Sequence, residues 1–474
     1  MDNQSWIHVV HQFLLRRKEV RFALICGFLL AFATQAANAE RFFSRDTGCA
    51  DAACDDTADC VADEGCTKCA GCGPCFVWGK DTFLKVGAGL RASYNAIENG
   101  NPNGGTRQDF NINNARIYMN GQGHKRIGFE FNTDINNAQA MVPGNGWDLH
   151  GVNGFSSMDE GELRILDAIV KFQITDNIGL WMGRFLPPSD RANLSGPFFQ
   201  NAWNFPFTQI GFPNIFQGRD DGAALWGQYG GGVVKWSVGV FEGENSGAAT
   251  AIGQPGTDNL MVNGRFVVNL LDPEPGYYNA STYYGEKDIL ALGGSFMHRK
   301  DALASTTGIG AEDYTGYNLD LLFERKLSNC GVVTFEAAYY DFDDHNGGYV
   351  DGSGNIVGVT LPPTGGYRQG ESYFVLGSYL FPRQFCFFNV KGRFQAMLRY
   401  QEYDRDSYAG DSSDSISAPT GAIAAGTDEQ WDLQLNYIMY GHNARISVVW
   451  SQLDDGISGE SNIDTLTVGT QLQF

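Results

Sequence analysis

The chain has 474 residues, of which 60 are glycine, 13% are aromatic and 18% are charged. This composition favours many short strands and turns over helical layers. The formal net charge of −21 excludes nucleic acid as a partner, because binding phosphates requires a basic surface. No HExxH, GxSxG or P-loop motif occurs, so the sequence predicts neither an enzyme nor a resident cofactor.

The N-terminus resembles an export signal. Four basic residues between Arg16 and Arg21 precede an apolar run from Phe22 to Ala33, and a small-x-small cleavage site ends at Ala39. We interpret residues 1–39 as a signal peptide. A membrane-anchoring helix is the alternative, but the apolar run is short for a bilayer.

Residues 40–78 are expected to form a separate Cys-rich periplasmic segment. "CTKCAGCGPC" spaces four of its cysteines by two residues, close enough to ligate zinc or an iron–sulfur centre. The oxidising compartment favours disulfides instead. The disulfide or metal candidates are Cys49, Cys54, Cys60, Cys66, Cys69, Cys72 and Cys75. Because seven is an odd number, one of these thiols is free to pair elsewhere. Cys330 and Cys386 lie beside neighbouring short turns and are expected to pair if those turns are close enough.

The remainder, residues 79–474, shows the alternation of β-strands. The C-terminal "TLTVGTQLQF" carries apolar side chains on one face and mostly polar ones on the other. Similar stretches recur, with short turns alternating with long Gly-, Asp- and Ser-rich connections. This pattern predicts an antiparallel transmembrane β-barrel of about sixteen strands in the bacterial outer membrane. The expected strands are 83–95, 109–120, 126–136, 162–174, 177–186, 220–229, 233–242, 258–269, 286–298, 313–326, 331–342, 369–381, 386–402, 428–438, 443–452 and 462–474.

One face of these strands is expected to meet lipid. It carries Ile127, Phe129, Phe131, Val234, Trp236, Val238, Leu433, Leu435 and Tyr437, with Trp431 and Trp450 near strand ends. The terminal Phe474 falls on this face. A C-terminal aromatic residue of this kind resembles the signal that the outer-membrane assembly machinery reads, so that machinery is an expected partner.

The other face is expected to line a pore and is mildly basic. Its basic positions are Lys85, Arg91, Arg116, Arg126, Lys171, Lys235, Arg265, Lys391, Arg393, Arg399 and Arg445. Its acidic positions are Glu130, Asp134, Asp167, Asp320, Glu324, Glu336 and Asp432. Basic residues in a pore favour anions. The alternative is that these charges pair with one another and fill a wet interior.

The connection from Pro187 to Arg219 is rich in aromatic residues and carries three charges. Folding it into the barrel, where it narrows the pore, or against a neighbouring subunit would bury its rings. The candidate constriction residues are Arg191, Phe198, Phe199, Trp203 and Arg219. A loop that meets lipid or another partner is the alternative.

"LDAIVKFQITDNIGLWMGRFLPPSDRANLSG" and the later "GRDDGAALWGQ" resemble the phosphate-selective porin O/P family. The matching residues are Asp167, Gly183, Arg184, Phe185, Pro188, Arg191, Arg219, Asp220 and Gly222. The resemblance implies a sixteen-stranded, trimeric outer-membrane channel over residues 80–474. This chain departs from the family in its Cys-rich segment and in its scarcity of Arg and Lys.

These observations together predict a porin for small hydrophilic solutes or ions, with a weak anion preference of the phosphate type. The expected partners are outer-membrane lipid, two further copies of the chain and the transported ions. The alternative is a non-conducting anchoring barrel tethered through its Cys-rich segment.

Overall fold

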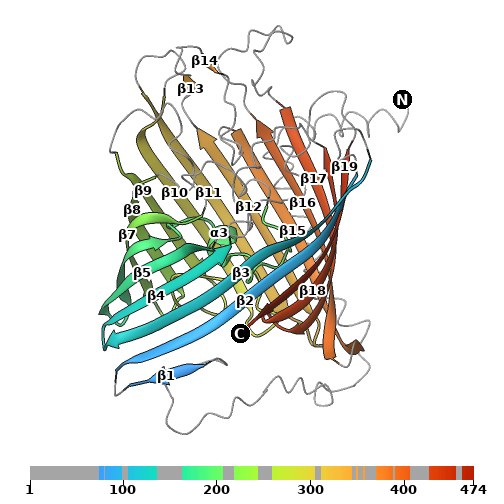
Figure 1. The fold of residues 1–474 in the computed structure, drawn as a ribbon, viewed down its shortest axis with the longest axis horizontal. Helices are drawn as coiled ribbons and strands as arrows, with labels where there is room; N and C mark the ends of the chain where they lie inside the picture. Colours follow the sequence, from blue (N-terminus) through green and yellow to red (C-terminus); the bar gives the residue numbers. More distant parts are fainter. Residues whose placement is uncertain are drawn as a thin grey trace, which may run out of the picture.

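The computed structural model describes residues 74–78, 81–98, 105–135, 163–206, 218–243, 259–304, 311–343, 349–350, 356–357, 370–387, 390–405, 426–454 and 462–474. These residues form a closed antiparallel β-barrel with a short helix inside it (Figure 1). The predicted signal peptide and most of the Cys-rich segment lie outside the described residues. No helix in the described ranges is long and apolar enough to cross a membrane.

Sixteen strands make up the barrel wall, as the sequence predicted. They are β2 (Phe83–Ile97), β3 (Arg107–His124), β4 (Ile127–Ile135), β5 (Leu163–Thr175), β6 (Ile178–Phe185), β7 (Asp220–Tyr229), β8 (Val234–Phe241), β9 (Met261–Asn269), β10 (Ile289–Ala304), β11 (Ala311–Lys326), β12 (Val332–Asp343), β15 (Gly370–Phe387), β16 (Val390–Arg405), β17 (Gly426–Tyr440), β18 (Ala444–Asp454) and β19 (Ile463–Gln473). A small hairpin of β13 (Tyr349–Val350) and β14 (Ile356–Val357) lies apart from the wall.

Each wall strand pairs with its sequence neighbours, and β19 pairs with β2 to close the barrel. At the seam, the main-chain N–H and C=O of Phe474 both bond to Ala88. Closure leaves no strand edge unpaired, which is a requirement for a sheet in lipid because hydrocarbon offers no hydrogen-bond partners. The seam is therefore completed by the last residue of the chain.

Side chains alternate between the two faces of the wall, as period two requires. Large apolar residues are exposed on the outside, including Ile127, Phe129, Val170, Met182, Val238, Phe266, Leu292, Phe296, Leu319, Leu398, Leu433, Leu435, Trp431, Trp450, Leu466, Val468 and Phe474. Polar side chains point inward, where most of them are buried. Tyr437 also lies on the outer face, but its ring packs against Phe387 and Phe394, so it is buried rather than exposed to lipid.

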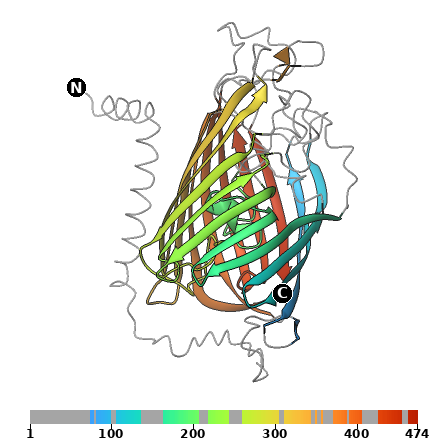
Figure 2. The same cartoon turned by 90° about the vertical axis from the view of Figure 1, so that its left-hand side faces the viewer.

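The wall varies in height around the barrel. β6 and β8 contain 8 residues each, whereas β15 contains 18 and β16 contains 16. Figure 2 shows the side of the barrel with the shorter strands, which are green. The sequence predicted a turn at "PRQF", but β15 continues through these residues with an irregularity between Leu380 and Gln384, and the chain turns after Phe387.

The strand β1 (Cys75–Val77) lies outside the wall and pairs with the first residues of β2. Cys75 is disulfide-bonded, and its partner lies outside the described residues. Cys330 and Cys386 form no disulfide with each other, so the pairing expected between them is not present.

Candidate pore and its two inserts

The first element inside the barrel is the loop-side insert, residues 186–206, which follows β6. It contains α3 (Arg191–Ser195), capped by the Asp190 carboxylate, which accepts a hydrogen bond from the Asn193 N–H. Gly183 has a φ of +125°, and a Cβ there would lie 2.0 Å from the Ala168 carbonyl oxygen. Only glycine fits this bend, which precedes the insert. Both views place α3 inside the barrel (Figures 1 and 2).

The aromatic rings of this insert pack against glycines of the wall. A Cβ on Gly469 would lie 2.4 Å from the Trp203 ring, and one on Gly89 would lie 2.8 Å from the Phe198 ring. Both rings are buried, with exposures of 2% and 1%. Glycine at these inward positions of β19 and β2 thus makes room for the two rings.

Arginines of the wall hold the main chain of the loop-side insert. Arg91 donates to the Trp203 carbonyl at 2.5 Å, and its guanidinium lies 4.0 Å from the centroid of the Trp203 ring. Arg445 donates to the carbonyls of residues 200 and 201 at 2.9 and 3.0 Å, and Arg399 donates to the carbonyl of Asn204 at 2.9 Å. Three predicted pore arginines therefore anchor the insert instead of facing an open channel.

A second element, the turn-side insert of residues 270–288, enters from the opposite end of the barrel. It connects β9 to β10, whereas the neighbouring connections at this end are tight turns. Its tip is buried, with exposures of 1% for Glu274 and Ser281 and 0% for Thr282. Its first residues, Leu270 and Leu271, remain exposed. An insert on this side was not predicted from the sequence.

The two inserts meet at a chain of buried charges. Arg191 of α3 donates to both carboxylate oxygens of Glu274, at 2.8 and 2.7 Å, and to the Ala280 carbonyl at 2.7 Å. The Arg191 main-chain N–H donates to Asp320, which also accepts two hydrogen bonds from Arg265 on β9. Burial raises the pKa of Glu274, but Arg191 outweighs burial and holds that pKa at about 2. Glu274 is therefore ionised at neutral pH.

His442, in the turn between β17 and β18, contacts both inserts. Its Nε2 donates to the Thr282 carbonyl at 2.9 Å, and its ring lies 5.0 Å from Phe199 and 4.9 Å from Tyr284, between centroids. Burial lowers the pKa of His442 to about 4. The ring is therefore neutral at pH 7 and packs as an aromatic side chain.

The inserts leave one part of the inner wall accessible to water. Inward side chains on β11 to β19 are mostly buried, as Glu324, Asn436 and Arg445 are. Across β2 to β5, a polar row of half-buried and exposed side chains remains near the turn side. Lys85 lies opposite Asn120 on the neighbouring strand, and Asn120 lies opposite Glu130 on the next one. Glu130 forms an ion pair with Lys171.

Two further ion pairs lie on the inner wall, on the loop side of this row. In each pair the carboxylate is less exposed than the guanidinium group. Arg219 contacts Asp167 at 2.9 Å, with side-chain exposures of 16% and 3% respectively. Arg116 contacts Asp134 at 2.7 Å, with exposures of 8% and 0%. In both pairs the basic group is therefore the one that water reaches more readily.

The remaining predicted pore residues fall into three groups. Lys235 and Arg265 point inward and contact the turn-side insert or its anchors, as Lys235 does by donating to the Tyr278 carbonyl. Arg393 lies half-buried at the turn end of the wall, and Lys391 is exposed there. Arg126 was expected on the wall, but it lies exposed in the turn between β3 and β4 and donates to the Gln173 carbonyl at 3.3 Å.

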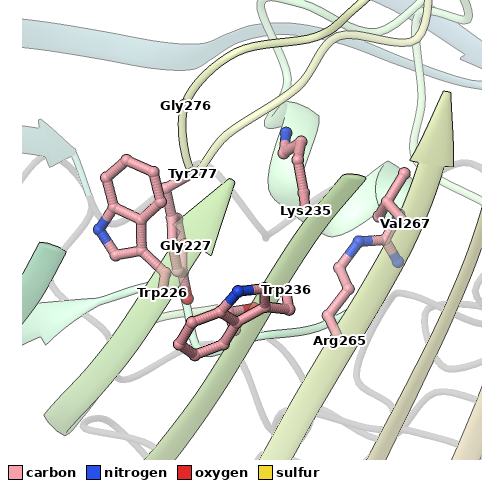
Figure 3. A pocket seen from close by; sticks show the side chains of 9 residues that line it. Trp226, Gly227, Lys235, Trp236, Arg265, Val267, Gly276 and Tyr277 are labelled. Carbon is pink, nitrogen blue, oxygen red and sulfur yellow. The ribbon is translucent and has the colours of Figure 1, made fainter. Parts of the chain in front are cut away.

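The turn-side insert packs closely against the wall beside it. The cavity of Figure 3 has a volume of about 10 Å³ and is lined by Trp226, Lys235, Trp236, Arg265 and Tyr277, among others. That volume holds at most about one water molecule.

Sequence reasoning missed Glu274 and the tyrosine-rich stretch "GYYNASTYYG" that follows it at residues 276–285. The available signal was the same as for the loop-side insert. Both connections carry more aromatic residues than a solvated loop can expose.

Comparison with known proteins supports the architecture. No family model and no curated protein matches the sequence. Among solved structures, OprB of Pseudomonas putida matches with a TM-score of 0.51 at 10% identity, over 83% of this chain and 94% of that chain. The chain shares the fold of this porin, a closed antiparallel β-barrel. OmpF of Salmonella typhi matches with a TM-score of 0.49 at 10% identity, over 84% of this chain and 99% of that chain. An anion-selective porin from Comamonas acidovorans matches with a TM-score of 0.47 at 10% identity, over 83% and 100% respectively.

Proposed function

We propose that the protein is a passive channel that passes small hydrophilic solutes or ions across the outer membrane. The observation that carries this proposal is the polar row on β2 to β5, in which Lys85, Glu130 and Lys171 are half-buried and Asn120 is exposed. Elsewhere the inserts bury most of the inner wall, so this row marks the side along which water and solute can pass. Polar side chains lining a narrow passage are typical of selective diffusion pores.

The proposed channel prefers anions weakly. Lys85, Lys171 and Arg219 reach water along the passage, whereas Glu130 is the one carboxylate of the polar row, and Asp167 lies behind Arg219. Accessible positive charge raises the local concentration of anions. The resemblance to the phosphate-selective porin O/P family agrees with this preference. Of its matching residues, Gly183 bends the chain before the loop-side insert, Arg191 joins that insert to Glu274, and Arg219 pairs with Asp167 of the wall.

The test is single-channel recording of the purified protein in a planar bilayer, with the reversal potential measured in a KCl gradient and phosphate added as a blocker. Discrete steps with an anion-side reversal are the expected result. A cation-side reversal would remove the anion preference and leave the channel intact.

A non-conducting anchoring barrel is the second candidate function. The filled lumen favours it, because buried ion pairs join Arg191 of the loop-side insert to Glu274 of the turn-side insert and to Asp320 of the wall. Demonstrably folded protein without any steps would support this candidate, with the Cys-rich segment as the tether.

The assembly proposals are a homotrimer and insertion by the outer-membrane assembly machinery through the strand that ends at Phe474. Light scattering of the detergent-solubilised protein tests the first of these, since a monomeric mass would exclude the trimer.

A further inference from the structure

The turn-side insert can move without opening the wall. Its flanking strands β9 and β10 pair continuously from Met261 opposite Arg299 to Asn269 opposite Ala291. Residues 270–288 contribute nothing to this ladder beyond their first residues, whose N–H groups bond across the base of the insert. The wall therefore keeps its main-chain ladder if the tip of the insert leaves the lumen, although the tip gives up its hydrogen bonds to Glu324, Lys235 and His442.

The tip of the turn-side insert contacts the loop-side insert as well as the wall, and together they fill this part of the lumen. The Ser281 N–H donates to the Phe199 carbonyl at 3.0 Å, and the Tyr277 hydroxyl donates to the Leu186 carbonyl at 2.9 Å. The hydroxyl oxygens of Ser195 and Ser281 lie 3.1 Å apart. Elements from the two ends of the barrel thus meet and narrow the lumen at one level.

Glu274 is the charged group that holds this junction. It is 1% exposed, accepts two hydrogen bonds from Arg191 and accepts a third from the Tyr283 hydroxyl at 2.6 Å. Without the Glu274 carboxylate, Arg191 Nε still lies 3.9 Å from the carboxylate of Asp320, which is already bonded twice by Arg265. Removing one partner of a buried ion pair leaves an uncompensated charge. That charge regains hydration if water enters the junction and the tip moves away.

We propose that the turn-side insert sets the size limit of the passage and that Glu274 is its positioning residue. The inference rests on the proposed channel function. With the tip seated, only solutes that fit beside the polar row on β2 to β5 pass. With the tip displaced, the lumen widens and larger neutral solutes enter.

The experiment compares wild type and Glu274→Gln, both full length, in planar bilayers in about 1 M KCl. At this ionic strength, interactions between exposed charges are screened within about 3 Å. Conductance is measured together with the largest polyethylene glycol that enters the channel. A severalfold higher conductance and a larger entering polymer are expected for Glu274→Gln. Glu402→Gln is the matched control, because Glu402 is 2% exposed and bonded by two tyrosine hydroxyls but lies on the outer face.

A reversible lock separates movement of the insert from a general loosening of the protein. Ser195→Cys and Ser281→Cys are added to Glu274→Gln, and oxidised glutathione accepts the two electrons released when the paired thiols form a disulfide. Oxidation is expected to restore the wild-type conductance and polymer limit, and dithiothreitol is expected to reverse both. Wild type treated in the same way controls for the native cysteines.

The outcomes separate the inference from the proposed function. A conducting wild type with an unchanged, folded Glu274→Gln variant would overturn the inference and leave the channel function standing. A silent wild type with a conducting variant would support the insert as the barrier and overturn constitutive conduction. If neither conducts while both are folded, both proposals fall.

Discussion

A valine at Gly469 should expel the Trp203 ring from its site on the wall. The Cβ of any other residue at this position would lie 2.4 Å from Trp203 Cζ2, well inside the roughly 3.5–4.0 Å of a normal carbon contact. The backbone of β19 is fixed by ladders to β18 and β2, so the ring must move. Burying a tryptophan removes about 150–250 Å² from water, which corresponds to about 4–6 kcal/mol at about 25 cal/mol per Å².

Displacement of Trp203 also breaks the hydrogen bond from its main-chain N–H to the Gln434 side chain at 2.9 Å. It removes the contact between the Trp203 ring and the Arg91 guanidinium group as well. The loss is expected to release the loop-side insert and leave the wall intact, because the new side chain leaves the main-chain ladder unchanged. Heat-dependent electrophoretic mobility checks that the barrel still folds.

The assay isolates Trp203 by subtracting the emission of a Trp203→Phe variant from that of its parent. In the wild type the difference spectrum should be blue-shifted and resistant to acrylamide. In Gly469→Val it should shift to the red and become quenchable. Gly294→Val is the control, because Gly294 lies on the outer face with its closest neighbour, a Leu319 methyl, at 3.3 Å. A buried, unquenched Trp203 in folded Gly469→Val would refute the argument.

Four further predictions concern other parts of the barrel. Asp432→Ala leaves Arg399 buried without its partner at 2.7 Å and should cost about 3–5 kcal/mol in urea unfolding from lipid vesicles; a cost near zero would contradict the pairing argument. Lys171→Gln removes an accessible positive charge, so the reversal potential in a KCl gradient should move toward the cation side. His442 has a pKa of about 4, below the roughly 6.5 of a free histidine, so its stabilising contribution is complete above about pH 6.5 and declines as the pH falls toward 4; the urea midpoint should fall over this range less in His442→Gln than in wild type. Deleting Phe474 removes both main-chain bonds to the start of the barrel and should lower the amount of folded protein in cell envelopes, whereas normal folded levels would argue against a role in assembly.

The resemblance motif illustrates how structure reassigns residues that sequence can only place. Arg219 and Asp167 lie far apart in the chain and pair across the inner wall at 2.9 Å. Arg184 also belongs to the motif, and it pairs on the outside of the wall with Asp221 at 2.7 Å. The motif therefore describes how the chain enters and leaves the loop-side insert, and it specifies no solute by itself.

Most of the predicted pore residues lie on the inner face of the wall, and several of them contact the inserts. Arg91, Arg399 and Arg445 point inward as expected, but each donates to main-chain carbonyls of the loop-side insert. Alternation determines which face a residue occupies, and it cannot show which segment will lie opposite. Arg126 failed on the simpler ground that strand ends are uncertain by a few residues, and it falls in a turn.

The sequence by itself determined the barrel. Period-two alternation, sixteen strands and the alternation of long and short connections follow from local patterns, because a sheet in lipid must show one apolar face and close on itself. The tertiary structure alone decided what fills the lumen. Arg191 and Glu274 are 83 positions apart and come from opposite ends of the barrel, and their contact exists only once the wall has brought both inserts to the same level. A contact between residues so far apart in the sequence depends on three-dimensional packing, which the local periodicity of the sequence does not encode.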